Sequence, residues 1–406
     1  MKLPSIPPHW TWKTVGELGS GGKPAVKAGP FGSALKKEFY VESGFRIYGQ
    51  EQVIAGDLSL GNYYIDARKF KNLKSCEVAT GDILVSLVGT FGKILIVPNV
   101  FEPGIINPRL VRLSLNPEFV DPYFFSRYFQ SSLAQFQMEL RSHGGTMNIL
   151  NAKNISDLLI PIPPIAEQKR IAAILDKAEE LRSLRRKALA ELDAIVQSIF
   201  LEMFGDPVTN PKGWNDSTLE EIAIKITDGE HLNPQFSLSG MSIVMAGNVL
   251  EDFVDLQNAK KVDFSLGQRF RKKCAPARGD ILLVSRGATI GRLCTVDCPD
   301  EFCLMGSVIL VKLNSSIVDS KYLKSLLKHP SMYGRLFKTS GSSAQQAIYL
   351  KDLKRLPCLL PPLSLQQEFT RRVEAIDRLK ATQRQSLAQL DTLFASLQHR
   401  AFQGEL

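Results

Sequence analysis

Two short stretches of the sequence gather the residue types that bind nucleic acid. Residues 66–74 and 267–273 each hold four Lys or Arg side chains, and each precedes an apolar run that begins Gly-Asp-Ile-Leu. Such cations neutralise phosphates, which positions a protein on DNA without reading its sequence. Because the cluster recurs at matching places, we predict phosphate contacts from Arg68, Lys69, Lys71 and Lys74 and from Arg269, Arg271, Lys272 and Lys273. The alternative is a charged surface exposed to solvent, the usual meaning of such runs.

Two polar loops are the second pair of candidates for DNA contact. The stretches RSHGGTMNIL, from residue 141, and KTSGSSAQQAIYL, from residue 338, are rich in small and polar residues. Glycine lets a backbone come close to a ligand, and Asn and Gln amides can pair with adenine in the major groove. We predict DNA contacts from Arg141, His143, Thr146 and Asn148 and from Lys338, Ser342, Gln345 and Gln346. The alternative is a Gly/Ser turn that leads into the next strand.

The sequence lacks the common catalytic and phosphate-binding motifs. A Walker A loop needs G-x4-G-K-[ST]. In GELGSGGKP, Glu17 stands at the first glycine and Pro24 replaces the hydroxyl residue, and VGTFGKI fails as well. An adenine methyltransferase is expected to carry a diproline tetrapeptide that holds the flipped base. The segments INPRL and DPYF each lack the second proline. We therefore predict a chain that has no catalytic residues, binds no cofactor itself and is not an enzyme.

The six cysteines give little support to a metal site. Cys294, Cys298 and Cys303 form C-x3-C-x4-C, which departs from the C-x2-C pairs of structural zinc sites and has no nearby His. We predict no metal and interpret the cysteines as reduced, partly buried thiols.

Composition and charge favour a soluble protein with a polyanionic partner. The chain has 406 residues, 44% of them hydrophobic, and a net charge of +9. Its length suggests two or three domains. The most apolar run, from Ile83, is interrupted by glycines and Lys93 and is too short to span a bilayer. The N-terminal residues show no secretory signal, so we expect a cytoplasmic protein without a membrane segment.

The chain consists of two similar halves. The run GDILVSLVGTFGK begins at Gly81 and GDILLVSRGATIGR begins at Gly279, an offset of 198 residues. The diprolines of PIPPIAEQKR and LPPLSLQQEF differ by the same offset, and Trp10 matches Trp214 at an offset of 204. This regularity predicts a tandem duplication of a unit of about 200 residues.

Each repeat begins with a compact part that mixes strands and helices. Short β-rich runs lie at residues 83–88, 93–97 and 281–284, separated by Gly, Asn and Pro. Helical patterns follow at residues 122–141 and 320–337. The mixture predicts an α+β domain in each repeat.

Each repeat ends in a long amphipathic segment. Residues 165–204 and 363–402 contain no Gly or Pro, and their apolar residues recur at steps of three and four. A helix of this length is about 60 Å long and leaves its apolar stripe wet unless it finds a partner. The first helix ends, through a short loop, at the second globular part, and the second helix begins there. Antiparallel pairing therefore needs no long crossover, whereas parallel pairing would require that part to span the full length of the helices. The expected fold is therefore α+β, with two repeated domains separated by a long antiparallel two-helix coiled coil.

The order of these landmarks resembles the specificity subunit of type I restriction-modification enzymes. The resemblance covers nearly the whole chain and rests on GDILVS, on NAKNISDLLIPIPPIAEQKRIAAIL, on SIFLEMFGDPVTNPKGW and on a second cycle that closes in LQHRAFQGEL. It implies two target recognition domains, residues 1–163 and 205–360, that each read one half of a bipartite double-stranded DNA target. It also implies two spacer helices, residues 164–204 and 361–406, that set the gap.

The resemblance further implies partner proteins. Two modification subunits would dock on the helices, and restriction subunits would join them for cleavage. S-adenosylmethionine, ATP and Mg²⁺ would belong to those partners. The predicted partner contacts are Gln168, Lys169, Arg170 and Phe204 in the first repeat and Gln366, Gln367 and Phe402 in the second. The alternatives are a stand-alone adenine methyltransferase with its own recognition domain and a purely structural spacer protein, which would leave the repeated basic clusters unexplained.

Overall fold

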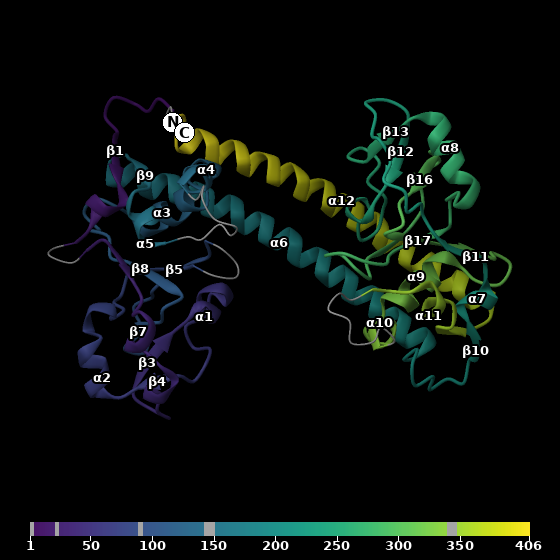
Figure 1. The fold of residues 1–406 in the computed structure, drawn as a ribbon, viewed down its shortest axis with the longest axis horizontal. Helices are drawn as coiled ribbons and strands as arrows, with labels where there is room; N and C mark the ends of the chain where they lie inside the picture. The colour runs from purple at the N-terminus through teal and green to yellow at the C-terminus, as the bar shows by residue number, and fades with distance from the viewer. Residues whose placement is uncertain (1–3, 21–23, 88–91, 142–150, 339–346) are drawn as a thin grey trace. The chain divides into compact units, whose positions relative to one another are not determined.

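The computed structural model describes residues 4–20, 24–87, 92–141, 151–338 and 347–406, and it divides into two units (Figure 1). Unit 1 comprises Met1–Arg185 with Ser386–Leu406, and unit 2 comprises Arg186–Gln385. Each unit therefore holds the globular part of one repeat and one half of each long helix. The domain boundaries predicted from the sequence treat the helices as separate parts, whereas here the helix halves belong to the units.

The described residues of unit 1 form three small sheets. The four-stranded sheet is antiparallel and has the order β2-β8-β5-β6. The three-stranded sheet has the order β4-β3-β7, in which β3 and β7 are parallel. A third pair, β1-β9, is antiparallel. The strands are β1 (Thr11–Thr14), β2 (Val26–Ala28), β3 (Phe45–Tyr48), β4 (Tyr64–Ile65), β5 (Ile83–Ser86), β6 (Ile94–Ile96), β7 (Gly104–Ile106), β8 (Leu110–Leu113) and β9 (Leu159–Ile162).

Unit 2 repeats this topology strand for strand. Its sheets have the orders β11-β17-β14-β15, β13-β12-β16 and β10-β18, with β12 and β16 parallel. The strands are β10 (Asn215–Thr218), β11 (Ala223–Asp228), β12 (Met241–Val244), β13 (Lys260–Val262), β14 (Ile281–Val284), β15 (Leu293–Thr295), β16 (Phe302–Leu304), β17 (Val308–Leu313) and β18 (Pro357–Leu360). The predicted duplication and the α+β class are both confirmed.

Most helices also match between the units, although one helix of each unit corresponds to a 3-10 turn in the other. In unit 1 they are α1 (Gln50–Ala55), α2 (Ala67–Asn72), α3 (Pro122–Phe129), α4 (Ser132–Arg141), α5 (Ala152–Ser156) and the first half of α6 (Ile165–Phe204). In unit 2 they are α7 (Leu219–Ile222), α8 (Phe264–Lys273), α9 (Ser320–Lys328), α10 (Pro330–Lys338), α11 (Leu350–Lys354) and the first half of α12 (Leu363–Ala401). Each of the helices predicted at residues 122–141 and 320–337 is in fact two helices, α3 with α4 and α9 with α10. Pro330 can only begin α10, because it lacks an N–H for the helix interior. Across the described ranges, no helix combines the length and hydropathy needed to cross a membrane.

The Gly-Asp of both Gly-Asp-Ile-Leu runs forms a turn, and its buried aspartate makes an ion pair. The two glycines have φ angles of +80° and +91°, a left-handed conformation that favours glycine. The carboxylates of Asp82 and Asp280 each accept a hydrogen bond from the backbone three residues upstream, at 2.7 and 2.8 Å. Asp82 lies 3.7 Å from Arg112 and Asp280 lies 2.7 Å from Lys312, both on the neighbouring strand. In both units the motif starts one of the two central strands of the four-stranded sheet, β5 or β14.

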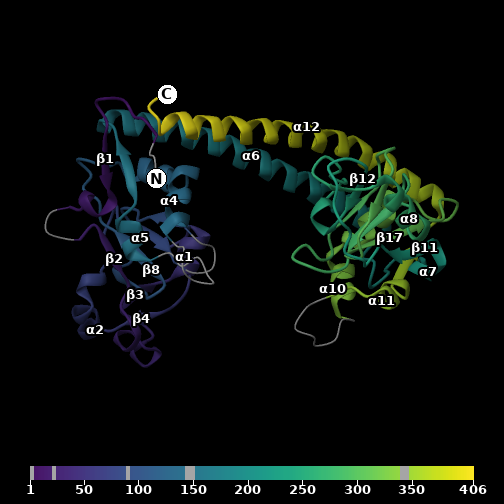
Figure 2. The same cartoon turned by 45° about the horizontal axis from the view of Figure 1, so that its top comes forward.

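The long helices are antiparallel in unit 1, as the sequence predicts. Arg182 Nε of α6 lies 2.6 Å from Asp391 Oδ1 of α12. Arg170, nearer the start of α6, donates a hydrogen bond of 2.5 Å to the backbone oxygen of Leu406, beyond the end of α12. The residue numbers in α12 therefore rise as those in α6 fall. Figures 1 and 2 show the two helices side by side in this unit.

The same direction holds in unit 2. Asp193 of α6 pairs with Lys380 of α12 at 2.5 Å. Further along α6, the ring of Phe200 packs edge-on against Phe369, nearer the start of α12, with centroids 5.8 Å apart. The helix pair is therefore a coiled coil of antiparallel halves in both units.

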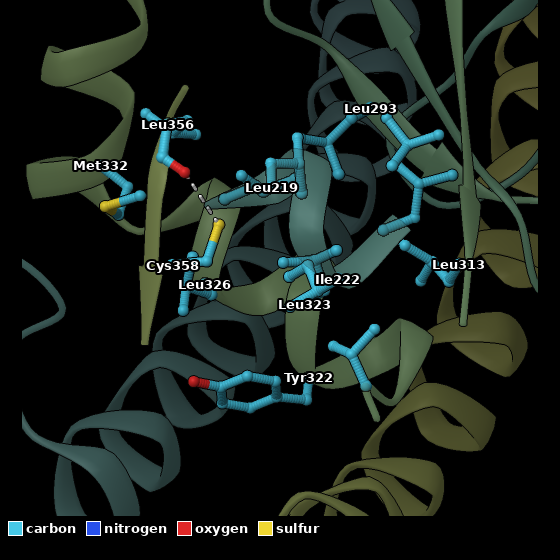
Figure 3. Packing of buried hydrophobic residues seen from close by; sticks show 14 of the residues in the cluster. Leu219, Ile222, Leu293, Leu313, Tyr322, Leu323, Leu326, Met332, Leu356 and Cys358 are labelled. Atoms are coloured by element: carbon cyan, nitrogen blue, oxygen red, sulfur yellow. Dashed lines mark hydrogen bonds between the residues drawn. The ribbon is translucent and has the colours of Figure 1, made fainter. Parts of the chain in front are cut away.

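The ends of both helices are part of the unit cores. Unit 1 buries the start of α6 and the end of α12, through Ile171, Ala172, Leu175, Ala401 and Phe402. Unit 2 buries the end of α6 and the start of α12, through Phe200, Met203, Phe204, Phe369 and Val373. Figure 3 shows the unit 2 core, where Tyr322 lies below Leu323, Ile222 and Cys358. Each globular part is thus completed by helix segments from both repeats.

Candidate nucleic-acid interface

The two predicted basic clusters occupy equivalent short helices. The first lies on and just after α2, and the second lies on α8. In each cluster, two cations three residues apart in the chain are exposed and make no ion pair or hydrogen bond with any described residue: Arg68 with Lys71, and Arg269 with Lys272. Residues at this spacing share one helix face. Each unit therefore presents a pair of cations suited to neighbouring phosphates.

The other four cations of these clusters are engaged within their units. Lys74 pairs with Glu77 at 2.6 Å, and Lys69 Nζ lies 3.4 Å from the centroid of the Phe39 ring. In unit 2, Arg271 pairs with Glu301 at 3.0 Å and Lys273 with Asp228 at 3.1 Å. Their charge is partly compensated, so they are weaker candidates for phosphate contact than the exposed pairs.

Several turns meet at one edge of the sheets in each unit, which we call the loop edge. In unit 1 it consists of residues 29–33, 87, 92–93 and 107–109, and in unit 2 of residues 229–232, 285–292 and 305–307. Gly29 N donates to Leu110 O at 3.0 Å, and Leu87 N donates to Arg109 O at 3.0 Å. The equivalent bonds in unit 2, from Gly229 N to Val308 O and from Ser285 N to Ser307 O, measure 3.1 and 2.9 Å. The loop edge is a convergence of turns on a rigid scaffold, the usual place for binding residues.

Exposed cations occur at this edge in both units. Arg109 and Lys93 are exposed in unit 1, and Arg286 is exposed in unit 2. In unit 2, Lys273 of α8 also reaches it, because its Nζ donates to Gly229 O at 2.8 Å. The loop edge was not predicted from the sequence, although the Gly-Pro-Phe-Gly stretch from Gly29 signals a tight turn that holds an apolar residue.

The polar-loop predictions lie mostly outside the described residues. His143, Thr146, Asn148, Ser342, Gln345 and Gln346 all fall there. Arg141 and Lys338 are the last residues of α4 and α10. In unit 2, Ala347, the first described residue after the loop, pairs with Arg286 at the loop edge. These eight contacts remain predictions.

The predicted partner contacts at the helix starts need correction. Gln168 and Gln366 are fully buried, and each completes the same network in its unit. Gln168 Nε2 donates to Phe119 O and Pro163 O at 2.8 and 2.9 Å, and its Oε1 accepts from Asp121 N at 2.9 Å. Gln366 makes the three equivalent bonds at 3.2, 2.8 and 2.9 Å. These amides lock the helix starts and cannot face a partner, whereas Lys169, Arg170 and Gln367 are exposed.

The aromatic residues at the helix ends need the same correction. Phe204 is 0% exposed and packs against Tyr322 with ring centroids 4.7 Å apart. Phe402 is 2% exposed and packs against Tyr128 at 5.1 Å. Both rings fill a core rather than a surface. The helical periodicity did not predict that these two rings are buried, because a residue at a helix end can face either the core or the solvent.

Unit 2 contains a buried ionic cluster around Asp252. Its carboxylate lies 2.6 Å from Lys324 of α9 and 3.1 Å from Lys380 of α12, and it also pairs with Arg384 of α12. Burial by itself would raise the pKa of Asp252, but the surrounding cations, Lys324 first, hold it well below its usual range. The cluster joins the turn at residues 249–254 to α9 and α12, so we call it the Asp252 clamp.

The thiols of the candidate zinc pattern are poor ligands in this fold. Burial raises the pKa of Cys294 to about 12 and that of Cys303 to about 11, and it also raises the pKa of Cys298. A thiol binds a metal as the thiolate, which these environments disfavour. Within the ranges that the structure describes, no group of three or more His, Cys, Asp or Glu side chains is placed to hold a metal ion.

Comparison with known proteins gives one consistent family. The model of the type I restriction modification DNA specificity domain matches the chain twice, over residues 27–194 and 211–392. The chain is 24% identical over 364 residues to the type I restriction enzyme EcoBI specificity subunit of Escherichia coli, an alignment that covers 80% of this chain and 73% of the relative. It is 22% identical over 362 residues to the putative type I restriction enzyme MjaX specificity subunit of Methanocaldococcus jannaschii, covering 84% and 82%.

Solved structures share the fold. The crystal structure of a type I restriction-modification system S subunit from M. genitalium aligns over 99% of both chains, with a TM-score of 0.51 and 15% identity. A chain from work on complex assembly and conformational transition of the type I R-M system aligns over 99% of this chain and all of its own length, with a TM-score of 0.50 and 19% identity.

Proposed function

The chain belongs to the family of type I restriction modification DNA specificity domains, and from that premise we propose that each unit reads one half of a bipartite double-stranded DNA target. The chain is the DNA-specificity subunit of a type I restriction-modification system and not a stand-alone methyltransferase, since its relatives are specificity subunits. Its role is recognition rather than catalysis.

One observation carries the proposal: the chain builds the same recognition scaffold twice. Both units have the same sheet orders, the same loop edge and the same basic helix with two exposed cations. The side chains at the loop edges differ between the units, as Arg109 and Ser307 illustrate at equivalent places. A common scaffold with different contact residues suits two half-sites of different sequence.

The paired helices supply the second part of the proposal. Two modification subunits dock on them, one for each repeat, and restriction subunits join for cleavage. S-adenosylmethionine, ATP and Mg²⁺ belong to these partners. Of the predicted contacts, Lys169, Arg170 and Gln367 are supported by their exposure. The helices also set the gap between the half-sites, because each unit core includes a segment of both helices. We also propose that the chain acts in the cytoplasm.

Methylation mapping tests this function. The chain is expressed in cells with its modification subunits, and the adenine methylation of the genome is sequenced with and without it. We expect a two-part target with a fixed gap to be methylated only when the chain is present. Methylation that does not depend on the chain would contradict the proposal. Stoichiometric binding of S-adenosylmethionine to the isolated chain would instead support the methyltransferase alternative.

A further inference from the structure

The first turn of the loop edge is anchored in the same way in both units. A Cβ atom on Gly29 would lie 1.9 Å from Asn107 O, and one on Gly229 would lie 2.3 Å from Leu304 O. No side chain fits at these distances, so each glycine holds the chain directly against the turn between the neighbouring strands. The backbone hydrogen bonds of these two glycines, 3.0 and 3.1 Å long, fix the position further.

Two residues beyond this anchor, unit 1 exposes an aromatic ring. The Phe31 side chain is 82% exposed, although Pro30 before it and Leu35 after it are buried. A short 3-10 turn, closed by the bond from Ala34 N to Phe31 O at 2.9 Å, holds the ring outward. A largely exposed phenylalanine is unfavourable in water, and on a hydrogen-bonded turn its backbone loses little conformational entropy when it binds.

Unit 2 places a different residue on the same anchor. His231 is half exposed, its Nε2 lies 2.6 Å from Asp228 Oδ2, and its ring lies over Gly306. The anchoring glycine and its hydrogen bond are shared, while the exposed side chain has changed from an apolar ring to a polar one. That is the pattern expected of a residue that contacts a half-site whose sequence differs between the units.

The neighbours of Phe31 indicate the kind of ligand. Arg109 follows Asn107 in the turn that packs against Gly29, and Lys36 and Lys37 follow the 3-10 turn. A ring without polar atoms cannot pair with phosphate, but cations beside it can. Apolar side chains flanked by cations insert between base steps or contact thymine methyl groups in DNA complexes.

On this basis, and resting on the proposed function, we propose that Phe31 is an apolar contact between unit 1 and the base pairs of its DNA half-site, and that His231 takes this place in unit 2. The contact stacks on or inserts at a base step. It adds affinity for one half-site without neutralising a phosphate.

The test uses the complex of the full chain with its modification subunits and a duplex that carries the target found by methylation mapping. Phe31→Ala is compared with Val100→Ala, because Val100 is 90% exposed in the same unit but lies between β6 and β7, away from the loop edge. We expect Phe31→Ala to weaken DNA binding about tenfold, a typical loss for removal of a base-stacking ring. Phe31→Ala should leave the dependence of DNA affinity on salt concentration unchanged. Arg109→Ala should instead lower the slope of log affinity against log salt concentration by about 1.

A fluorescent base separates the outcomes. With 2-aminopurine at each position of the unit 1 half-site, the wild type should raise the fluorescence at one step, and Phe31→Ala should abolish that rise. The inference is overturned if the Phe31→Ala complex binds DNA within twofold of the Val100→Ala complex. It is also overturned if Phe31→Ala loses its modification subunits, because Phe31 would then contact protein rather than DNA. Failure of the wild-type complex to bind the duplex would instead contradict the proposed function.

Discussion

Two glutamine side chains in neighbouring positions have different structural roles. Gln366 is fully buried and makes three hydrogen bonds, while Gln367 beside it is exposed. Residue type and spacing could not distinguish the two, so both were predicted to contact a partner. Burial is decided by the loop before α9, whose backbone lies against the start of α12, and the pattern of α12 does not contain that information.

This difference predicts unequal costs of substitution. Gln366→Ala should lower the free energy of unfolding by about 2–3 kcal/mol, because it leaves buried backbone groups without partners. Gln367→Ala should change it by less than about 0.5 kcal/mol, as surface substitutions usually do. Urea unfolding of the two variants measures both values. Equal effects would show that the Gln366 network does not stabilise the helix start.

The exposed cations of α2 make a second prediction at the residue scale. The double variant Arg68→Ala/Lys71→Ala should weaken DNA binding by the assembled complex. It should also lower the slope of log affinity against log salt concentration by about 2, because each phosphate contact releases about one counterion. Lys74→Ala is the matched control, since Lys74 already pairs with Glu77. Binding titrations at several salt concentrations give the slopes. A slope that falls equally in the control would refute the role of the exposed pair.

At the element scale, the long helices were the most predictable part of the fold. Their apolar residues recur with helical spacing and no Gly or Pro interrupts them, so the bounds of α6 match the prediction and those of α12 nearly do. The three predicted β-rich runs are strands β5, β6 and β14. Most other strands were not predicted, because runs of three or four apolar residues fit a strand or a buried helix equally well. The clamp between α9 and α12 could not be foreseen, since Asp252 comes from a loop.

The clamp predicts an acid-sensitive attachment of the helices in unit 2. The folded-state pKa of Asp252 lies below its unfolded value of about 3.9. Its stabilising contribution is therefore complete above about pH 4 and is lost as the pH falls toward the folded pKa. Asp252→Asn should cost about 3 kcal/mol at pH 7, because it leaves buried cations unpaired, and less as the pH falls below 4. Unfolding measured between pH 2 and 7 tests this, and a cost independent of pH would contradict it.

The helix pair also predicts the gap in the DNA target. Inserting two helical turns, about seven residues or 11 Å, into both α6 after Arg186 and α12 after Gln385 should widen the gap by about three base pairs. Both helices must be lengthened together because they are antiparallel partners. An insertion into α6 alone is the control and should destabilise the protein. Methylation mapping gives the gap, and an unchanged gap would mean that the helices do not set it.

At the scale of the whole molecule, the duplication organises the protein. Repeated landmarks in the sequence predicted it, and the matching strand orders of the two units confirm it. The positions of individual DNA contacts were less predictable, because the loop edge is assembled from turns that are far apart in the sequence. Gly29 and Leu110, for example, are joined there by one hydrogen bond.

If each unit reads one half of the target independently, an exchange of one unit should change one half alone. Residues 1–160 are replaced by those of a relative that recognises a different target, and the methylated sequence is mapped with the same modification subunits. We predict that one half of the target changes while the other half keeps its sequence. A change in both halves, or in neither, would contradict the account.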